Sequence, residues 1–108
     1  MSGEASWHEV PGVDPATASF PLVARAGSER VVIVRTPKGL RGVEPQCPHL
    51  KAAMTTAVQM ANGTMLRCVK HNFIFRLSDG KGVNCLGLSL KVYDVRETQG
   101  RLEVLIAG

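Results

Sequence analysis

The stretch of sequence from residue 47 to residue 71 decides how this chain is interpreted. It reads CPHLKAAMTTAVQMANGTMLRCVKH. Its two ends are the motifs Cys47-Pro48-His49 and Cys68-Val69-Lys70-His71, with eighteen residues between His49 and Cys68. Each motif is short enough for one tight loop to direct a thiol and an imidazole to the same point. Cys47, His49, Cys68 and His71 are therefore treated as one candidate metal site.

The segment between the two motifs contains a turn signal. Asn62-Gly63 is flanked by Val58 to Ala61 and by Thr64 to Arg67, a pattern typical of a two-residue β-hairpin. A hairpin centred there would bring the two Cys/His pairs together. Residues 51–58 form the only helix candidate, and it is weak.

The rest of the chain predicts short strands separated by turns. Residues 30–35 are rich in β-branched side chains, which favours a strand buried on both faces. Eleven glycines and six prolines mark the turns, and with the short strands they favour an all-β, antiparallel domain. Other candidate strands cover residues 6–10, 20–24, 40–43, 73–76, 90–96 and 101–104. The length of 108 residues predicts one domain, with residues of about 45–72 forming an inserted hairpin.

Composition excludes several classes of protein. A net charge of +4 is too mild for a nucleic-acid binder, and no apolar run is long enough to cross a membrane. The N-terminus lacks a secretory signal, so we expect a cytoplasmic protein. Three cysteines in a reducing compartment are better interpreted as ligands or free thiols than as disulfides. No catalytic triad, carboxylate pair or phosphate loop is evident, so the sequence does not predict an enzyme.

Two thiolates and two imidazoles suit either zinc or an iron–sulfur cluster. Common zinc fingers keep their cysteines together and their histidines together, whereas here each loop offers one of each. The pattern C-P-H-x18-C-x-x-H, followed by Phe73-x-Phe75 and Asp79-Gly80-x-Gly82, resembles a Rieske domain, in which one iron takes two cysteines and the other two histidines. The resemblance implies a β-sandwich base, a small cluster-binding subdomain, and a [2Fe–2S] cluster on Cys47, His49, Cys68 and His71. Cys85 is expected to be a buried non-ligand.

The chain departs from one branch of the family, the Rieske proteins of respiratory bc complexes. Rieske proteins of respiratory bc complexes have a disulfide between the cluster loops, where this chain has Ala52 and Lys70. They also have a serine and a tyrosine that donate to cluster sulfurs, where this chain has Phe73 and Phe75. Fewer donors predict a low reduction potential.

The low potential and short length resemble soluble Rieske ferredoxins. These imply a monomeric electron carrier from a flavin-containing reductase to a terminal oxygenase, either a monooxygenase or a dioxygenase. A nitrite reductase small subunit and a structural zinc domain are the alternatives.

Three departures from the family pattern lie near the second motif. Asn72 replaces a frequent glycine, Lys70 replaces a frequent aromatic, and residues 84–88 replace a proline-rich loop that covers the cluster. That loop either is more mobile or packs through its leucines. Asp79 is the only acidic residue from 47 to 82, so we expect a basic face, which either is simply solvated or steers the protein toward an acidic patch on a redox partner. The cations of this face are Lys51, Arg67, Lys70, Arg76 and Lys81.

Overall fold

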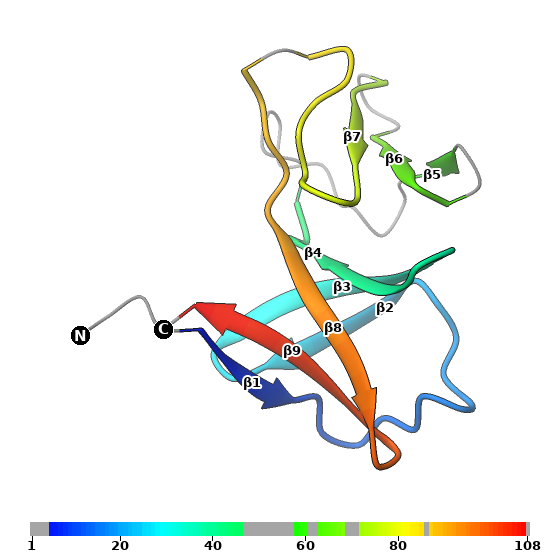
Figure 1. Ribbon diagram of the computed structural model, residues 1–108, viewed down its shortest axis with the longest axis vertical. Coiled ribbons are helices and arrows are strands. Elements are labelled where there is room, and N and C mark those ends of the chain that lie inside the picture. Colours follow the sequence, from blue (N-terminus) through cyan, green and yellow to red (C-terminus); the bar gives the residue numbers. More distant parts are fainter. Residues whose placement is uncertain (1–4, 47–57, 61–62, 69–71, 86, 108) are drawn as a thin grey trace.

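The computed structural model describes residues 5–46, 58–60, 63–68, 72–85 and 87–107, and all the regular elements in these ranges are β-strands (Figure 1). They form a six-stranded and a three-stranded antiparallel sheet, which confirms the expected all-β, antiparallel fold. The larger sheet contains β1 (Ala5–Glu9), β2 (Leu22–Ala26), β3 (Glu29–Thr36), β4 (Gly39–Val43), β8 (Val92–Thr98) and β9 (Arg101–Ala107). The smaller one contains β5 (Val58–Met60), β6 (Met65–Arg67) and β7 (Ile74–Arg76). We call the larger sheet the base, and the chain between Glu44 and Lys91 the second lobe.

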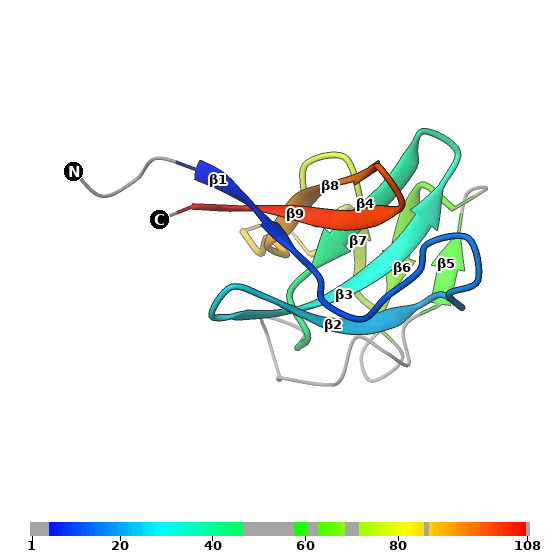
Figure 2. The same cartoon turned by 90° about the horizontal axis from the view of Figure 1, so that it is seen from below.

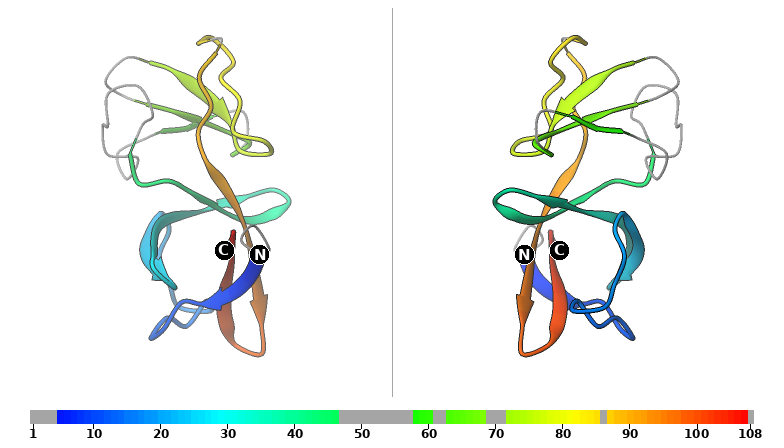
Figure 3. Two further views of the ribbon diagram at one scale, coloured as in Figure 1. Left: turned by 90° about the vertical axis from the view of Figure 1, so that its left-hand side faces the viewer. Right: turned by 90° about the vertical axis from the view of Figure 1, so that its right-hand side faces the viewer.

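The base folds over at β8. Its strand order is β1-β9-β8-β4-β3-β2, and β8 pairs with β4 through Val92 to Asp94 and with β9 through Val95 to Thr98. Figure 2 shows β1 running beside β9, and Figure 3 shows the β2–β3–β4 side facing the β1–β9–β8 side. Apolar side chains from both sides form the base core: Val10, Ala24, Ala26, Val31, Ile33, Tyr93, Leu102, Val104 and Ile106.

Strand β3 lies between two cores. Successive side chains of a strand point to opposite faces, and Val31 and Ile33 pack in the base core. Val32 and Val34 pack on the other face, in the core of the second lobe. The expected burial of this strand on both faces is therefore confirmed, since all four side chains are buried.

The second lobe packs on that other face of β3. Its core consists of Val32, Val34, Val43, Leu66, Cys68, Phe75, Leu77, Cys85 and Leu90. The β5–β6 pairing joins Val58 to Arg67 and Met60 to Met65, the register that a turn at residues 62–63 predicts. The three-stranded sheet continues to Arg76. Of the weak helix candidate, residue 58 begins β5, and residues 51–57 lie outside the described ranges.

The second lobe leaves and rejoins the base at a single junction. The backbone N–H of Glu44 donates to the Lys91 carbonyl at 2.9 Å, and the N–H of Lys91 donates to Glu44 Oε2 at 2.6 Å. A second tie comes from Arg41 on β4, which donates from Nε to the Leu77 carbonyl (2.9 Å) and from Nη2 to the Ser78 carbonyl (3.0 Å). The same guanidinium pairs with Asp94 on β8. These contacts hold the second lobe in a fixed place on the base.

Several predicted strand ends were wrong by two or three residues. Strand β2 begins at Leu22 rather than Phe20, because Pro21 lacks the N–H that a strand needs. Strand β8 begins at Val92 rather than Leu90, and β9 continues past Val104 to Ala107, where it pairs with β1. None of the described segments is a helix long and apolar enough to span a membrane.

Candidate metal centre

Cys68 is the one predicted ligand within the described ranges, because Cys47, His49 and His71 lie outside them. It directly follows β6, and its side chain is only 2% exposed. It packs in the same core as Val43, the last residue of β4. Cys47 comes four residues after Val43, so the strand that leads to the first motif ends in the core that contains Cys68.

The loop that carries His71 is closed by backbone hydrogen bonds at its base. The N–H of Cys68 donates to the Phe73 carbonyl at 2.8 Å, and the N–H of Asn72 donates to the Cys68 carbonyl at 2.8 Å. Asn72 has a φ of 57°, in the left-handed region that glycine and asparagine adopt most readily. This conformation explains why asparagine can stand where the family often has glycine. Arg67 Nη1 also donates to Asn72 Oδ1 at 2.5 Å.

A second contact to this loop comes from residue 84 and was missed by the sequence reasoning. The side-chain oxygen of Asn84 accepts from the N–H of Ile74 at 2.9 Å. Its side-chain nitrogen donates to the Asn72 carbonyl at 2.9 Å. No sequence pattern signals such a side-chain-to-backbone contact across twelve residues.

The surroundings of Cys68 are apolar. Phe75 is fully buried in the same core, and Phe73 and Leu88 are partly buried against it. One expectation for residues 84–88 was that the loop packs through its leucines. Leu88 does so, whereas Leu86 lies outside the described part of the chain. Cys85 is 8% exposed, which confirms its expected burial, and its thiol approaches the Ile74 carbonyl at 3.9 Å.

The expected basic face is partly neutralised. Arg76 forms an ion pair with Asp79 at 2.6 Å. Asp79 also accepts the N–H of Lys81 at 3.0 Å, and this backbone hydrogen bond, with the Arg76 charge, lowers the pKa of the Asp79 carboxyl. Arg67 and Lys81 form no ion pair with any described residue. Lys51 and Lys70 lie outside the described ranges.

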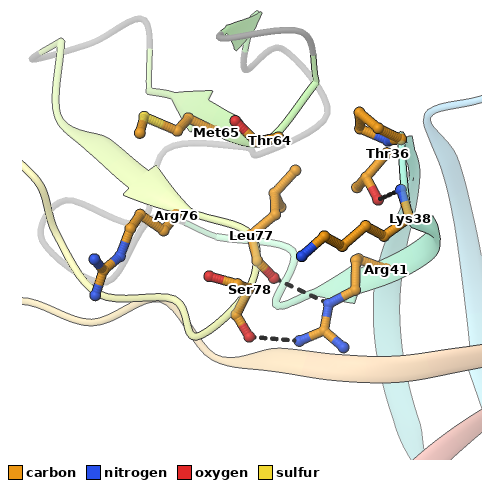
Figure 4. A pocket seen from close by; sticks show the side chains of 9 residues that line it. Thr36, Lys38, Arg41, Thr64, Met65, Arg76, Leu77 and Ser78 are labelled. Atoms are coloured by element: carbon orange, nitrogen blue, oxygen red, sulfur yellow. Dashed lines mark hydrogen bonds between the residues drawn. The ribbon is translucent and has the colours of Figure 1, made fainter.

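A cleft of about 230 Å³ lies between the lobes (Figure 4). The base contributes Thr36, Pro37, Lys38 and Arg41, and the second lobe contributes Thr64, Met65, Arg76, Leu77 and Ser78. Cys68 does not line it, and the hydrogen bonds from Arg41 to Leu77 and Ser78 cross it. We assign this cleft to the joint between the lobes rather than to the metal centre.

Comparisons with known proteins bear on the family and the fold of this chain. A family model described as the Rieske [2Fe-2S] domain matches residues 6–94. The methanesulfonate monooxygenase ferredoxin subunit of Methylosulfonomonas methylovora is 32% identical over 94 residues, which are 87% of this chain and 75% of that protein.

Two solved structures share the fold. The ferredoxin of carbazole 1,9a-dioxygenase from Nocardioides aromaticivorans IC177 has a TM-score of 0.72 and 21% identity, with 92% of this chain and 96% of that chain covered. A Mycobacterium tuberculosis protein described as an NADH-dependent nitrite reductase small subunit has a TM-score of 0.78 and 20% identity, with 97% and 98% covered.

Proposed function

Because this chain belongs to the Rieske [2Fe–2S] domain family, we propose that Cys47, His49, Cys68 and His71 hold a [2Fe–2S] cluster and that the protein carries single electrons. The observation that supports this most directly is the position of Cys68. Its thiol is buried, and its backbone N–H and carbonyl form the hydrogen bonds that close the loop leading to Asn72 and Phe73. That thiol shares a core with the end of the strand leading to Cys47. Two thiolates and two imidazoles are the donor set that such a cluster takes.

The residues around Cys68 would determine how readily the site accepts an electron. A bound [2Fe–2S] cluster supplies one-electron redox chemistry. Hydroxyl donors near its sulfurs would stabilise the added negative charge and raise the potential, but Phe73 and Phe75 carry none. We therefore expect a midpoint in the low part of the Rieske range of about −150 to +300 mV. A clearly positive midpoint at neutral pH, measured by protein film voltammetry, would contradict this expectation.

We place the protein between a flavin-containing reductase and a terminal oxygenase, as an electron-transfer component rather than as a catalyst. The similarity to a monooxygenase ferredoxin subunit supports this role. In this proposal residues 1–108 form one Rieske domain, with a cluster-binding subdomain of about 45–72, and the protein works as a monomer in the cytoplasm.

The cysteines provide a matched test of the ligand set. Cys68→Ser should abolish the brown colour and the Rieske-type electron paramagnetic resonance signal of the reduced protein. Cys85→Ser changes a second buried thiol in the same core and should leave both signals in place. A colourless wild-type protein that contains zinc would instead support the structural zinc domain.

A second candidate is the small subunit of a nitrite reductase, which the similar size and fold of the mycobacterial protein favour. The two roles differ in their partners. Reduced protein should transfer electrons to the terminal oxygenase of its own system at a rate that supports turnover. Stable co-purification with a larger nitrite-reducing subunit, without transfer to an oxygenase, would favour the second role.

A further inference from the structure

The segment that follows His71 is hydrogen-bonded along both of its edges. On one edge, Cys68 exchanges backbone hydrogen bonds with Asn72 and Phe73. On the other edge, residues 81–83 run antiparallel to residues 74–76. The N–H of Arg76 donates to the Lys81 carbonyl at 3.0 Å, and the N–H of Val83 donates to the Ile74 carbonyl at 2.7 Å.

At Ile74 the side chain of Asn84 takes part in this second ladder. In a hydrogen-bonded antiparallel pair the two residues exchange both of their backbone bonds, so the N–H of Ile74 would ordinarily donate to the Val83 carbonyl. It donates to Asn84 Oδ1 instead, while Asn84 Nδ2 donates to the Asn72 carbonyl. The side-chain amide thus takes the place of a backbone peptide and extends the ladder by one step toward His71.

Asn84 itself belongs to a tightly built turn. The N–H of Gly82 donates to the Leu88 carbonyl at 3.0 Å, and the N–H of Leu88 donates to the Cys85 carbonyl at 3.1 Å. A Cβ atom on Gly82 would lie 2.5 Å from Cys85 Sγ, so glycine is needed for this close approach. Cys85 is buried in the core. The backbone that presents the Asn84 amide is therefore held in place on both sides.

We propose that Asn84 is a positioning residue for His71. The inference rests on the proposed function, since it assumes that His71 is a ligand. Asn72 directly follows His71, and its carbonyl is held by the Asn84 amide while its N–H is held by Cys68. These two bonds fix the peptide units on either side of Asn72, the residue that directly follows His71. In this proposal that anchor sets the orientation of the imidazole and of nearby backbone N–H donors. Such outer contacts tune both the affinity for a metal centre and its potential.

Two variants of Asn84 separate the two halves of the contact. Asn84→Asp has nearly the same shape and keeps an acceptor for the Ile74 N–H, but it replaces the donor to Asn72 by an oxygen. Asn84→Ala removes both bonds. Val83→Ala is the matched control, because that side chain lies in the same turn and is 47% exposed.

The experiment measures three properties of the cluster-loaded proteins: the midpoint potential, the g-values of the reduced state and the rate of iron loss to a chelator. Both Asn84 variants should shift the reduction equilibrium at least threefold, about 28 mV at 59 mV per tenfold change for one electron. They should also alter the g-values and lose iron several-fold faster, whereas Val83→Ala should match the wild type. Amide hydrogen exchange at Ile74 should accelerate in Asn84→Ala.

The outcomes are distinct. Wild-type potential and g-values in both variants would overturn the proposal, even if their melting temperatures fell, because a merely structural contact would lower only the latter. If Asn84→Ala does not fold, the near-isosteric Asn84→Asp decides. A wild-type protein without a cluster would overturn the proposed function, and unchanged exchange at Ile74 would independently refute the anchoring by Asn84.

Discussion

At the scale of single residues, Asn72 and Tyr93 each have surroundings from which a change in the free energy of unfolding can be predicted. Asn72 has a φ of 57° and accepts a hydrogen bond from Arg67. Tyr93 is only 6% exposed in the base core, with its hydroxyl 3.5 Å from Glu29 Oε1. At Asn72 the constraint is the backbone conformation, and at Tyr93 it is the ionisation of a buried phenol.

The left-handed conformation of Asn72 predicts an order among its substitutions. A β-branched residue is disfavoured there, so Asn72→Val should lower the free energy of unfolding by about 1–3 kcal/mol. Asn72→Gly keeps the conformation and should cost less, since it loses mainly the contact with Arg67. Denaturant unfolding of the two variants checks this order, and an equal loss in both would show that the conformation is not the cause.

Tyr93 predicts a change of stability in alkali. Burial raises the pKa of its phenol, while the Lys91 ammonium lowers it. A raised pKa in the folded state means that the contribution of Tyr93 is complete below its ordinary value near 10 and is lost as the pH rises through the folded value. Tyr93→Phe should therefore lose less stability than the wild type over that range, as measured by denaturant unfolding at a series of alkaline pH values.

The direct measurement is simple, because Tyr93 is the one tyrosine of the chain. The ultraviolet absorbance of tyrosinate should appear at higher pH in the folded protein than in urea. Lys91→Met removes the neighbouring ammonium and should move the folded transition higher still. A transition at the same pH in folded and unfolded protein would contradict this account.

At the scale of elements, the β8–β9 hairpin shows what a turn requires. Thr98 pairs with Arg101, and the two residues between them both have positive φ, 53° at Gln99 and 75° at Gly100. Two-residue hairpin turns of this kind favour Asn-Gly. The turn at residues 99–100 was predicted from the sequence, but glutamine at its first position is an unusual choice.

Gln99→Asn should therefore stabilise the protein. The left-handed region costs an ordinary side chain roughly 1–2 kcal/mol, a cost that asparagine largely avoids, so we expect a gain of about 0.5–1 kcal/mol. Thermal unfolding measures it, with Gly100→Ala as the control that should be less stable than the wild type. A less stable Gln99→Asn would mean that the glutamine makes a contact that matters more than its backbone.

Elements with strong local signals were the predictable ones. The β-branched run of residues 30–35 and the Asn62-Gly63 turn predicted β3 and the β5–β6 register correctly. The pairing of β1 with β9 was not predicted, because it joins residues almost a chain length apart. The Arg41 and Asn84 contacts were missed for a similar reason: each joins a side chain to a distant backbone carbonyl or N–H that leaves no local pattern. The four proposed ligands were predicted from the spacing of their two motifs and from the resemblance to a Rieske domain, and only Cys68 of the four lies in the described ranges.

At the scale of the whole molecule, charge is distributed unevenly between the second lobe and the base. The second lobe contains Arg67 and Lys81, which have no ion-pair partner in the described ranges, while Arg76 is neutralised by Asp79. Lys51 and Lys70 belong to the same lobe by sequence. At the opposite end of the base, the β8–β9 hairpin contains Arg101 (Figure 1).

This distribution predicts electron transfer that depends on salt. Opposite charges steer association and can raise its rate by tenfold or more at low ionic strength. Transfer to the oxygenase should therefore slow as ionic strength rises, and Lys70→Glu or Lys81→Glu should weaken that dependence. Arg101→Glu makes the same charge change at the far end and should have little effect in stopped-flow measurements. Rates indifferent to salt would remove the steering hypothesis.

The junction of Glu44 with Lys91 has a further consequence for how the molecule can be rebuilt. These two residues are already hydrogen-bonded to each other. The chain therefore leaves the base and returns to it at neighbouring positions. The base and the segment between positions 44 and 91 can therefore be treated as two exchangeable parts. The corresponding segment of another Rieske protein could be inserted between positions 44 and 91 without distorting β4 or β8. Arg41 is the side chain whose acceptors any replacement would have to reproduce.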